Sequence, residues 1–352
     1  WPSVAIVIPA HNEARVIAEL IASLRAIDYP NLTVTLALDR CTDGSGDIAR
    51  AAIAGDPRFT LEEIDRCEEG WAGKVHAVYR GVHAGADGGA LNADLLLFAD
   101  ADTLFHPGCV KACVSLLEDR GLQMLSLVST MRYERWFELV AQPMAGLELI
   151  RQYPLLASNS GPDRRAFANG QFMLFTRDCY ARFGGHHEVR KYLLEDLRFA
   201  DILKYYFMPQ GVLLADGMLV CRMYDSWEQF RKGWKRIFTE AAHRKPSRLA
   251  ALGLRVRVSQ CLLPAGAFAG VVIGVATHRP WMAGPGAAGL ALWLLALMAM
   301  QRLARGPWWC ALTAWLGGWL VGGLLLEAGR DVKRGKPTEW GGMSYLRREK
   351  AE

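Results

Sequence analysis

The chain has 352 residues, with 41 Lys and Arg against 36 Asp and Glu, so its formal net charge is +5. Hydrophobic residues at 51% and charged residues at 22% exclude a disordered chain, and so small a positive charge gives no indication of nucleic-acid binding. The apolar residues are unevenly spread: residues 258–326 are almost entirely apolar, which excludes a purely soluble protein.

Short apolar runs typical of buried strands alternate with helical spacings in the first part of the chain. The expected strands are Val4–Pro9, Leu32–Asp39, Phe59–Ile64 and Ala93–Ala99. A helix is expected after each of the first three strands, and the third helix opens at the glycine-rich EEGWAGK. This alternation predicts an α/β fold with a mostly parallel, Rossmann-like sheet, which binds ligands beyond the carboxyl ends of its strands.

Acidic residues occupy those carboxyl ends. Asp39 ends the second strand, and Asp100 and Asp102 follow the fourth. Two carboxylates one residue apart suit Mg²⁺ or Mn²⁺, which prefer oxygen ligands. The alternative is a solvated turn, or a cap for the helix expected near Pro107, but the position after a buried strand favours the ligand interpretation.

Three more segments border the expected strands and helices: Pro9–Glu13, Asp39–Gly44 and Gly70–Lys74. None of them has the spacing of a P-loop or of a GxGxxG loop. Gly73 and Lys74 are either a helix start with an exposed lysine or a cation placed beside a diphosphate.

The combination resembles the family 2 glycosyltransferases, whose nucleotide-sugar domain has the GT-A fold. The segments that carry the resemblance are VIPAHNE (Val7–Glu13), LDRCTDGS (Leu38–Ser45), GWAGKVHAVYRG (Gly70–Gly81), FADADT (Phe98–Thr103), GQFML (Gly170–Leu174) and LED (Leu194–Asp196). They occur in the family's order and cover roughly Val4 to Trp234. SLVSTMRYERWFE (Ser126–Glu138) and the segment Trp340–Tyr345 add a likeness to the hopanoid-associated, carotenoid-type and ceramide-glucosyltransferase-like branch.

The resemblance implies a role for each matching residue on the donor side. Asp39 would contact the nucleobase, Asp100 the ribose side of the nucleotide, and Asp102 a divalent Mg²⁺ or Mn²⁺ ion at the diphosphate. Pro9, Glu13 and Lys74 would line the same nucleotide-sugar pocket.

On the acceptor side, the resemblance implies contacts from Gly170, Gln171, Phe172 and Glu195, with Asp196 as the general base. A carboxylate in a partly desolvated pocket can be tuned to take the proton of an acceptor hydroxyl. The alternative is that Glu195 and Asp196 simply start the amphipathic helix expected over Leu197–Phe207.

Polymer-forming members of the family carry a QxxRW motif, whereas Gln229–Trp234 has Lys in place of Arg and its Trp one residue late, which disfavours a polymer synthase. We expect Trp234 on the acceptor side. Aromatic residues from Trp227 to Phe238 share one helical face flanked by cations, which favours a helix in the membrane interface over a core-facing helix of the head. Arg231 or Lys235 from this helix is alternatively expected at the diphosphate.

Three apolar segments without charged residues are each long enough to cross a membrane: Val258–Thr277, Trp281–Gln301 and Pro307–Leu326. Gly284, Pro285 and Gly286 make the middle span the least secure. Three crossings would put the end of the chain opposite the head, whereas its Lys and Arg residues favour the cytoplasmic side. We expect both ends in the cytoplasm, with one segment re-entrant.

The eight cysteines form no CxxC pair and no metal-ligand set, which predicts reduced thiols in a reducing compartment. The expected organisation is a GT-A domain (1–225), basic interfacial helices (226–257), a membrane region of two to three spans (258–328) and a basic, cytoplasmic tail (329–352). The sequence thus predicts a multi-pass inner-membrane enzyme whose catalytic domain faces the cytoplasm.

The expected reaction is metal-dependent transfer of one sugar, with inversion, from a nucleotide-sugar to the hydroxyl of a membrane lipid. The family resemblance favours a UDP-sugar as donor. The alternatives are transfer to a polyprenyl phosphate, whose anion needs no base, and a non-catalytic or transport-associated role. The absence of charged residues within the spans disfavours transport.

Overall fold

A computed structural model gives the fold and describes residues 1–84, 89–160, 166–340 and 343–345. The chain forms two compact units, each built from two chain segments. Unit 1 comprises Trp1–Thr130 and Tyr153–Arg222, and unit 2 comprises Met131–Gln152 and Met223–Glu352. Unit 1 therefore ends close to the expected boundary at residue 225, while the excursion Met131–Gln152 folds with the C-terminal half of the chain.

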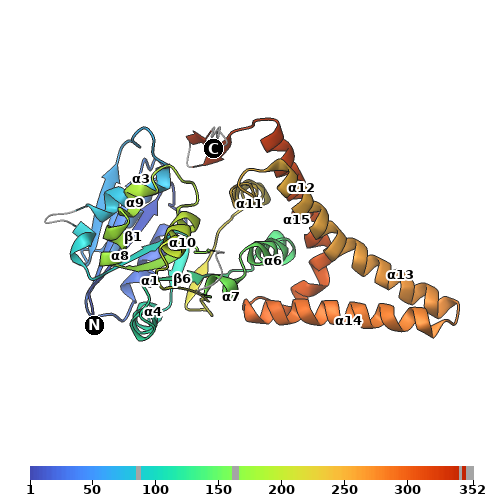
Figure 1. Cartoon of the computed structure of the whole chain (residues 1–352). Helices are drawn as coiled ribbons and strands as arrows, with labels where there is room; N and C mark the ends of the chain where they lie inside the picture. Colours follow the sequence, from blue (N-terminus) through green and yellow to red (C-terminus); the bar gives the residue numbers. More distant parts are fainter. Residues whose placement is uncertain (85–88, 161–165, 341–342, 346–352) are drawn as a thin grey trace. The chain divides into compact units, whose positions relative to one another are not determined.

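Unit 1 is built on a seven-stranded sheet in the order β3-β2-β1-β4-β8-β6-β9 (Figure 1). Its strands are β1 (Val4–Ala10), β2 (Leu32–Asp39), β3 (Phe59–Ile64), β4 (Leu95–Ala99), β6 (Met124–Val128), β8 (Phe172–Thr176) and β9 (Gln210–Leu214). All neighbours are parallel except β8, which runs antiparallel between β4 and β6. The predicted mostly parallel sheet is confirmed.

Helices and a small second sheet surround these strands. The helices of unit 1 are α1 (Ile17–Arg25), α2 (Ser45–Ile53), α3 (Gly73–Val82), η1 (Gly89–Asn92), α4 (Cys109–Asp119), α7 (Leu155–Ser158), α8 (Arg177–Arg182), α9 (Gly185–Glu188) and α10 (Glu195–Tyr205). In the small sheet, β5 (Thr103–Phe105) pairs antiparallel with β10 (Leu219–Cys221), and its third strand, β7 (Thr130–Met131), lies where the chain leaves unit 1.

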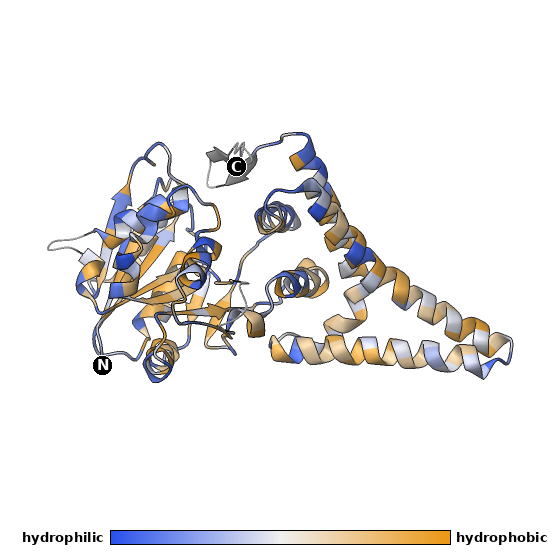
Figure 2. Ribbon diagram, in the orientation of Figure 1, coloured by the Kyte–Doolittle hydropathy of each residue, from blue (hydrophilic) through white to orange (hydrophobic). Residues whose placement is uncertain are grey.

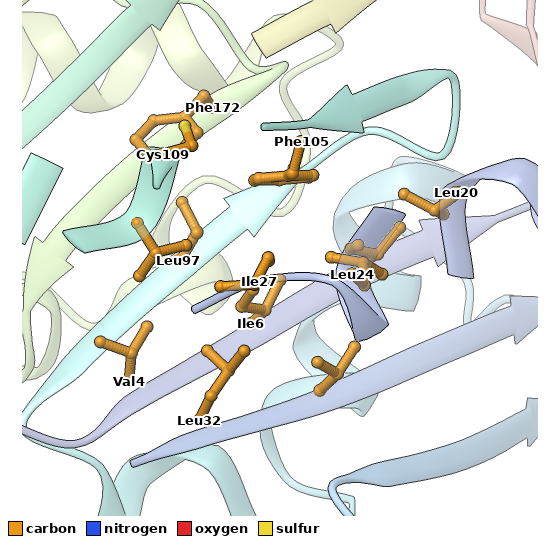
Figure 3. Packing of buried hydrophobic residues seen from close by; sticks show 14 of the residues in the cluster. Val4, Ile6, Leu20, Leu24, Ile27, Leu32, Leu97, Phe105, Cys109 and Phe172 are labelled. Atoms are coloured by element: carbon orange, nitrogen blue, oxygen red, sulfur yellow. The ribbon is translucent and has the colours of Figure 1, made fainter. Parts of the chain in front are cut away.

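The core of unit 1 forms where the apolar faces of α1 and α4 meet the sheet. Figure 3 shows Ile6 of β1 between Leu97 of β4 and Leu24 of α1, and all three are fully buried. On α3, a Cβ added to Gly81 would lie 2.7 Å from Cγ1 of Val7, so only glycine allows this close approach of α3 to β1. Tight packing of these helices fixes the loops at the carboxyl ends of the strands.

Unit 2 is mainly helical. Its elements are α5 (Trp136–Val140), α6 (Gln142–Gln152), α11 (Trp227–Ala241), α12 (Pro246–Arg257), the π-helical turn η2 (Val258–Leu262), α13 (Leu263–Ala276), α14 (Pro280–Leu303), η3 (Trp308–Thr313), α15 (Ala314–Lys333), β11 (Thr338–Trp340) and β12 (Met343–Tyr345). Three helical stretches are long and apolar enough to cross a membrane: Pro246–Ala276, Pro280–Leu303 and Trp308–Lys333. Figure 2 shows the apolar colour along α13 and α14. The middle stretch continues through Pro285.

The first and third of these stretches pack antiparallel through small residues. A Cβ added to Gly329 near the end of α15 would lie 3.2 Å from the carbonyl oxygen of Pro246, at the start of α12. A Cβ added to Gly318, near the start of α15, would lie 2.5 Å from Cβ of Gln260. The start of the first stretch and the end of the third therefore lie at the same end of unit 2.

The aromatic face of α11 is buried inside unit 2. Phe230 and Phe238 are inaccessible to solvent and Trp234 is 3% exposed, and all three belong to a core that α5, α6 and α15 share. This face is therefore core-facing, but within unit 2 and not within the head, and the interfacial position of α11 stays a prediction. The helical periodicity was sufficient to identify the face, but it did not identify what covers that face.

Candidate active site

Lys74 lies at the centre of a cluster of carboxylates in unit 1. Its Nζ is 2.6 Å from Oδ1 of Asp100, just after β4, and 2.8 Å from Oε1 of Glu195, at the start of α10. Although burial opposes the charge on Lys74, the carboxylates of Asp100, Glu195 and Asp196 raise its pKa. Lys74 is therefore a permanently charged bridge between two loops, in contrast to the alternative of an exposed lysine.

Asp196 lies beside this bridge and is held by two backbone groups. The N–H of Gly170 donates to its Oδ2 at 2.8 Å, and the N–H of Leu197 donates to its Oδ1 at 2.8 Å. A Cβ added to Gly170 would lie 3.0 Å from Nζ of Lys74 and 3.2 Å from Oδ2 of Asp196, so glycine leaves the room for both groups. Burial and then the charge of Glu195 raise the pKa of Asp196 to about 7.

Asp102 presents a buried oxygen that has no partner. Its Oδ1 forms no hydrogen bond, and burial followed by the charge of Asp100 raises its pKa to about 7. Its other interactions include a hydrogen bond with the Cys221 thiol, which also accepts from Nε2 of Gln171 at 2.9 Å. The environment of Cys221 includes the charges of Asp100, Asp102 and Glu13, and together with burial they raise the pKa of the thiol.

The pairing of β4 with β8 explains why the GQFML segment lies beside the acidic turn. Ala99, the last residue of β4, pairs with Phe172, the first residue of β8. The residues that follow β4 and those that precede β8 therefore meet at the same end of these two strands. The ring of Phe172 is fully buried and packs near Phe105. Phe172 therefore anchors the segment from within the core, while Gly170 and Gln171 reach the site.

Asp39 lies buried at the end of β2 and forms a bidentate pair with Arg40. The Nε and one terminal nitrogen of Arg40 donate to the two carboxylate oxygens at 2.9 and 2.7 Å. Nδ1 of His11 lies 2.6 Å from the carbonyl oxygen of Asp39. This pair fixes the orientation of the Asp39 carboxyl group at the carboxyl end of the sheet.

The loops after β1 and β2 are tied together. The N–H of Glu13 donates to Oγ of Ser45 at 2.8 Å, and the N–H of Ala14 donates to Oδ2 of Asp43 at 2.9 Å. Pro9 pairs with Ala37 inside the sheet. The sequence-predicted residues Pro9, Glu13 and Asp39 are therefore held in one rigid part of unit 1.

Two predicted residues belong to unit 2. A terminal nitrogen of Arg231 donates to Glu327 at 2.9 Å, so a diphosphate would have to compete with this carboxylate. Nε1 of Trp234 donates to Oε1 of Gln142 at 3.1 Å inside the helical core. Helices of unit 2 cover the ring of Trp234, and its acceptor-side role stays a prediction.

Sequence analysis did not single out two further residues, Arg40 and Cys221. Arg40 directly follows Asp39 within LDRCTDGS, and its adjacency to a strand-end acid is the signal that was available. Cys221 comes to the site through the antiparallel pairing of β10 with β5, opposite Thr103, which no local pattern reveals. All eight cysteines of the chain are free.

Comparison with known proteins identifies the family of this chain. The family model described as glycosyltransferase like family 2 matches residues 2–243. The chain belongs to this family. Two curated relatives are 4,4'-diaponeurosporenoate glycosyltransferases from Staphylococcus aureus: that of strain MRSA252 is 25% identical and that of strain USA300 is 24% identical, each over 256 residues. Both matches cover 72% of this chain and 65% of the relative, which is less than two thirds of the relatives' length.

Among solved structures, the mannosyltransferase PcManGT from Pyrobaculum calidifontis, in complex with GDP-Man and Mn²⁺, is similar with a TM-score of 0.52 and 17% identity. The alignment covers 94% of this chain and 87% of that one. This likeness shows the GT-A fold of the family 2 glycosyltransferases.

The candidate site has a donor set that fits one divalent ion in part. Among the described residues, Asp102 offers a buried oxygen without a partner. Burial and then the charge of Asp100 raise its pKa, and a cation would offset both effects. No group of three or more His, Cys, Asp or Glu side chains among the described residues is arranged to hold a metal. Mg²⁺ and Mn²⁺ usually complete their shells with water and substrate phosphates, so a single protein carboxylate agrees with an ion that arrives with its substrate.

Proposed function

We propose that this protein is a membrane-bound, inverting glycosyltransferase that moves one sugar from a UDP-sugar to the hydroxyl of a membrane lipid. The observation that carries the proposal is the Lys74 bridge, because it joins the predicted donor residue Asp100 to Glu195, the neighbour of the predicted base. This bridge supports a site in which donor and acceptor would be held in one fixed geometry, as bond transfer between two substrates requires.

On the donor side, Asp39 and Asp100 would hold the nucleoside, and Asp102 would hold a divalent ion. When bound, that ion would stabilise negative charge on the departing diphosphate. Lys74 keeps its charge within the cluster and contributes to the same stabilisation, since preorganised cations act strongly in a site that excludes water.

On the acceptor side, Asp196 would accept the proton of the lipid hydroxyl. The hydroxyl oxygen then forms a bond to the anomeric carbon, and the bond from that carbon to the diphosphate oxygen breaks with its electron pair leaving on the diphosphate. Attack on the face opposite the leaving group inverts the configuration. A pKa near 7 suits a base that works at neutral pH.

The membrane setting is supported by the three candidate spans and by the curated relatives, which are named for an apolar carotenoid acid. We place unit 1 on the cytoplasmic side of the cell membrane. The antiparallel packing of α12 and α15 supports a topology in which both ends of unit 2 face that side, with Arg330 and Lys333 following the positive-inside rule.

The test uses the purified full chain in detergent with UDP-sugars, Mn²⁺ and a lipid extract, and mass spectrometry of the products. Asp196→Asn is expected to lower turnover by about 10²–10⁴-fold while donor binding by calorimetry is unchanged. Asp178→Asn, which removes a carboxylate that is exposed on α8, is the matched control and should keep full turnover.

Two outcomes would contradict the proposal. Unchanged turnover in Asp196→Asn would indicate an acceptor that is already an anion, such as a polyprenyl phosphate or a carboxylate. No nucleotide-sugar binding by the unaltered protein would favour a non-catalytic role.

A further inference from the structure

A cavity of about 850 Å³ lies along α12 and α15 in unit 2, and none of the candidate active-site residues lines it. Three cations line it: Arg257 from α12, and Arg330 and Lys333 from α15. Small and apolar residues, among them Ala250, Gly323 and Leu326, form the rest of its wall. The cavity thus combines cations with an apolar wall.

The cations of the cavity have no acidic partner among the described residues. The acids of α15, Glu327 and Asp331, pair with other cations. Arg231 and Lys235 of α11 bind Glu327 at 2.9 Å each. Lys235 also pairs with Asp331, and Lys336 lies 3.0 Å from the other oxygen of Asp331. Nε of Arg257 is buried without a hydrogen-bond partner, and its guanidinium lies 4.1 Å from the ring centroid of Trp319. Uncompensated positive charge therefore collects in the cavity.

Helical spacing explains this separation of charge. Gly323, Leu326, Arg330 and Lys333 recur every three to four residues and share one face of α15. Glu327 and Asp331 are four residues apart on the adjacent face, which α11 covers. The helix thus directs its carboxylates to α11 and its cations to the cavity.

The cavity also crosses from the apolar to the charged part of the helix pair. Gly323 and Leu326 belong to the apolar part of α15, whereas Arg330 and Lys333 form its last turn. On α12, Arg257 directly precedes the apolar run that starts at Val258. In a membrane-spanning helix this transition occurs at the level of the lipid headgroups.

We propose that this cavity binds an anionic phospholipid of the membrane. Its phosphate would be held by Arg330 and Lys333, since guanidinium and ammonium groups both form charge-assisted hydrogen bonds with phosphate oxygens. One acyl chain would lie against Leu326 and Gly323. The lipid is an accessory ligand that joins α12 to α15, and the proposal does not depend on the sugar-transfer chemistry.

The experiment is native mass spectrometry of the purified full chain, released from micelles that contain phosphatidylglycerol and phosphatidylcholine in equal amounts. The unaltered protein is expected to retain one phosphatidylglycerol in preference to phosphatidylcholine. Arg330→Gln with Lys333→Gln should lower this preference by roughly tenfold or more, because two cations near the headgroup are lost. The matched control is Arg248→Gln with Arg334→Gln, which removes equal charge from exposed positions of the same helix ends outside the cavity and should keep the preference.

A second variant keeps every charge. Ala250→Trp fills the cavity from an exposed position on α12 and is expected to prevent phospholipid retention, which tests the site even where the charge variants fail to fold. Three outcomes would overturn the proposal: an unaltered preference in the cavity variants, an equal loss in the matched control, or displacement of the bound lipid by millimolar inorganic phosphate, which would indicate a site for free anions.

Discussion

The two units arrange charge in opposite ways. In unit 1, one cation, Lys74, is surrounded by the carboxylates of Asp100, Glu195 and Asp196, so negative charge dominates at the carboxyl end of the sheet. In unit 2, the acids Glu327 and Asp331 are paired within the helices, and positive charge is left over on α12 and α15. The arrangement in unit 1 suits a metal-bound nucleotide, and the arrangement in unit 2 suits an anionic surface. The net charge of +5 is therefore the sum of two regions with opposite local charge.

The largest effect is expected from Lys74→Met. Loss of the bridge should lower turnover by about 10²–10³-fold. It should also lower the free energy of unfolding in detergent by about 3–5 kcal/mol, because the buried Glu195 loses its partner. Lys111→Met, which removes an exposed lysine paired with exposed Asp28, is the control and should cost less than about 1 kcal/mol. Equal effects of the two variants would refute the special role of the bridge.

The second prediction concerns a buried carboxylate in unit 2. Glu148 is buried and pairs with Arg255, and Gln152 donates to it at 3.3 Å. Arg255→Met should destabilise the protein by about 2 kcal/mol. This is less than the cost of leaving a buried charge without any partner, because Gln152 still donates a hydrogen bond to Glu148. Sugar transfer per folded molecule should not change, in contrast to Lys74→Met. Arg248→Met on the same helix serves as the control, and a loss of turnover with unchanged stability would contradict the comparison.

The third prediction is a pH dependence of turnover. Because burial raises the pKa of Asp196 to about 7, the folded protein holds this carboxyl protonated below that pH, and a protonated base cannot accept the hydroxyl proton. Activity at saturating Mn²⁺ should therefore rise about tenfold per pH unit up to about pH 7 and then level off. The residual activity of Asp196→Asn should lack this rise; if the same rise persists, another group is responsible.

The smallest effect is expected at the pairing of α11 with α15. Glu327→Gln removes the shared partner of Arg231 and Lys235, which are partly exposed, so the loss should be about 1 kcal/mol of unfolding free energy. Lys232→Gln, which removes an exposed pair with Glu228, should change stability by less than that. Melting temperatures of both variants in one detergent check the order, and a larger effect for Lys232→Gln would reverse it.

The sequence was most informative where local pattern and burial coincide. The apolar runs Leu32–Asp39 and Phe59–Ile64 match β2 and β3 residue for residue, because turn-forming residues bound each run. The acids at the strand ends were located for the same reason. The antiparallel β8 was not predicted, since its neighbours β4 and β6 come from distant parts of the chain.

Contacts made by the fold account for what the sequence missed. Lys74 was located by its motif, but its burial depends on Asp100 and Glu195, which lie far along the chain. The aromatic face of α11 was recognised by its period, while its burial depends on α5, α6 and α15. The roles of Asp39, Asp102 and Asp196 remain predictions, and the Asp196→Asn experiments above test the last of them.

The excursion Met131–Gln152 has a practical consequence for making the protein. A fragment cut after Arg222 would contain every strand of the large sheet, yet it would also carry α5 and α6 without the helices that cover them. Phe137, Ala141 and Met144, all buried in the full chain, would then face water. Such a fragment is expected to aggregate. A soluble version needs two changes: removal of the C-terminal helices and replacement of the excursion Met131–Gln152 by a short polar linker.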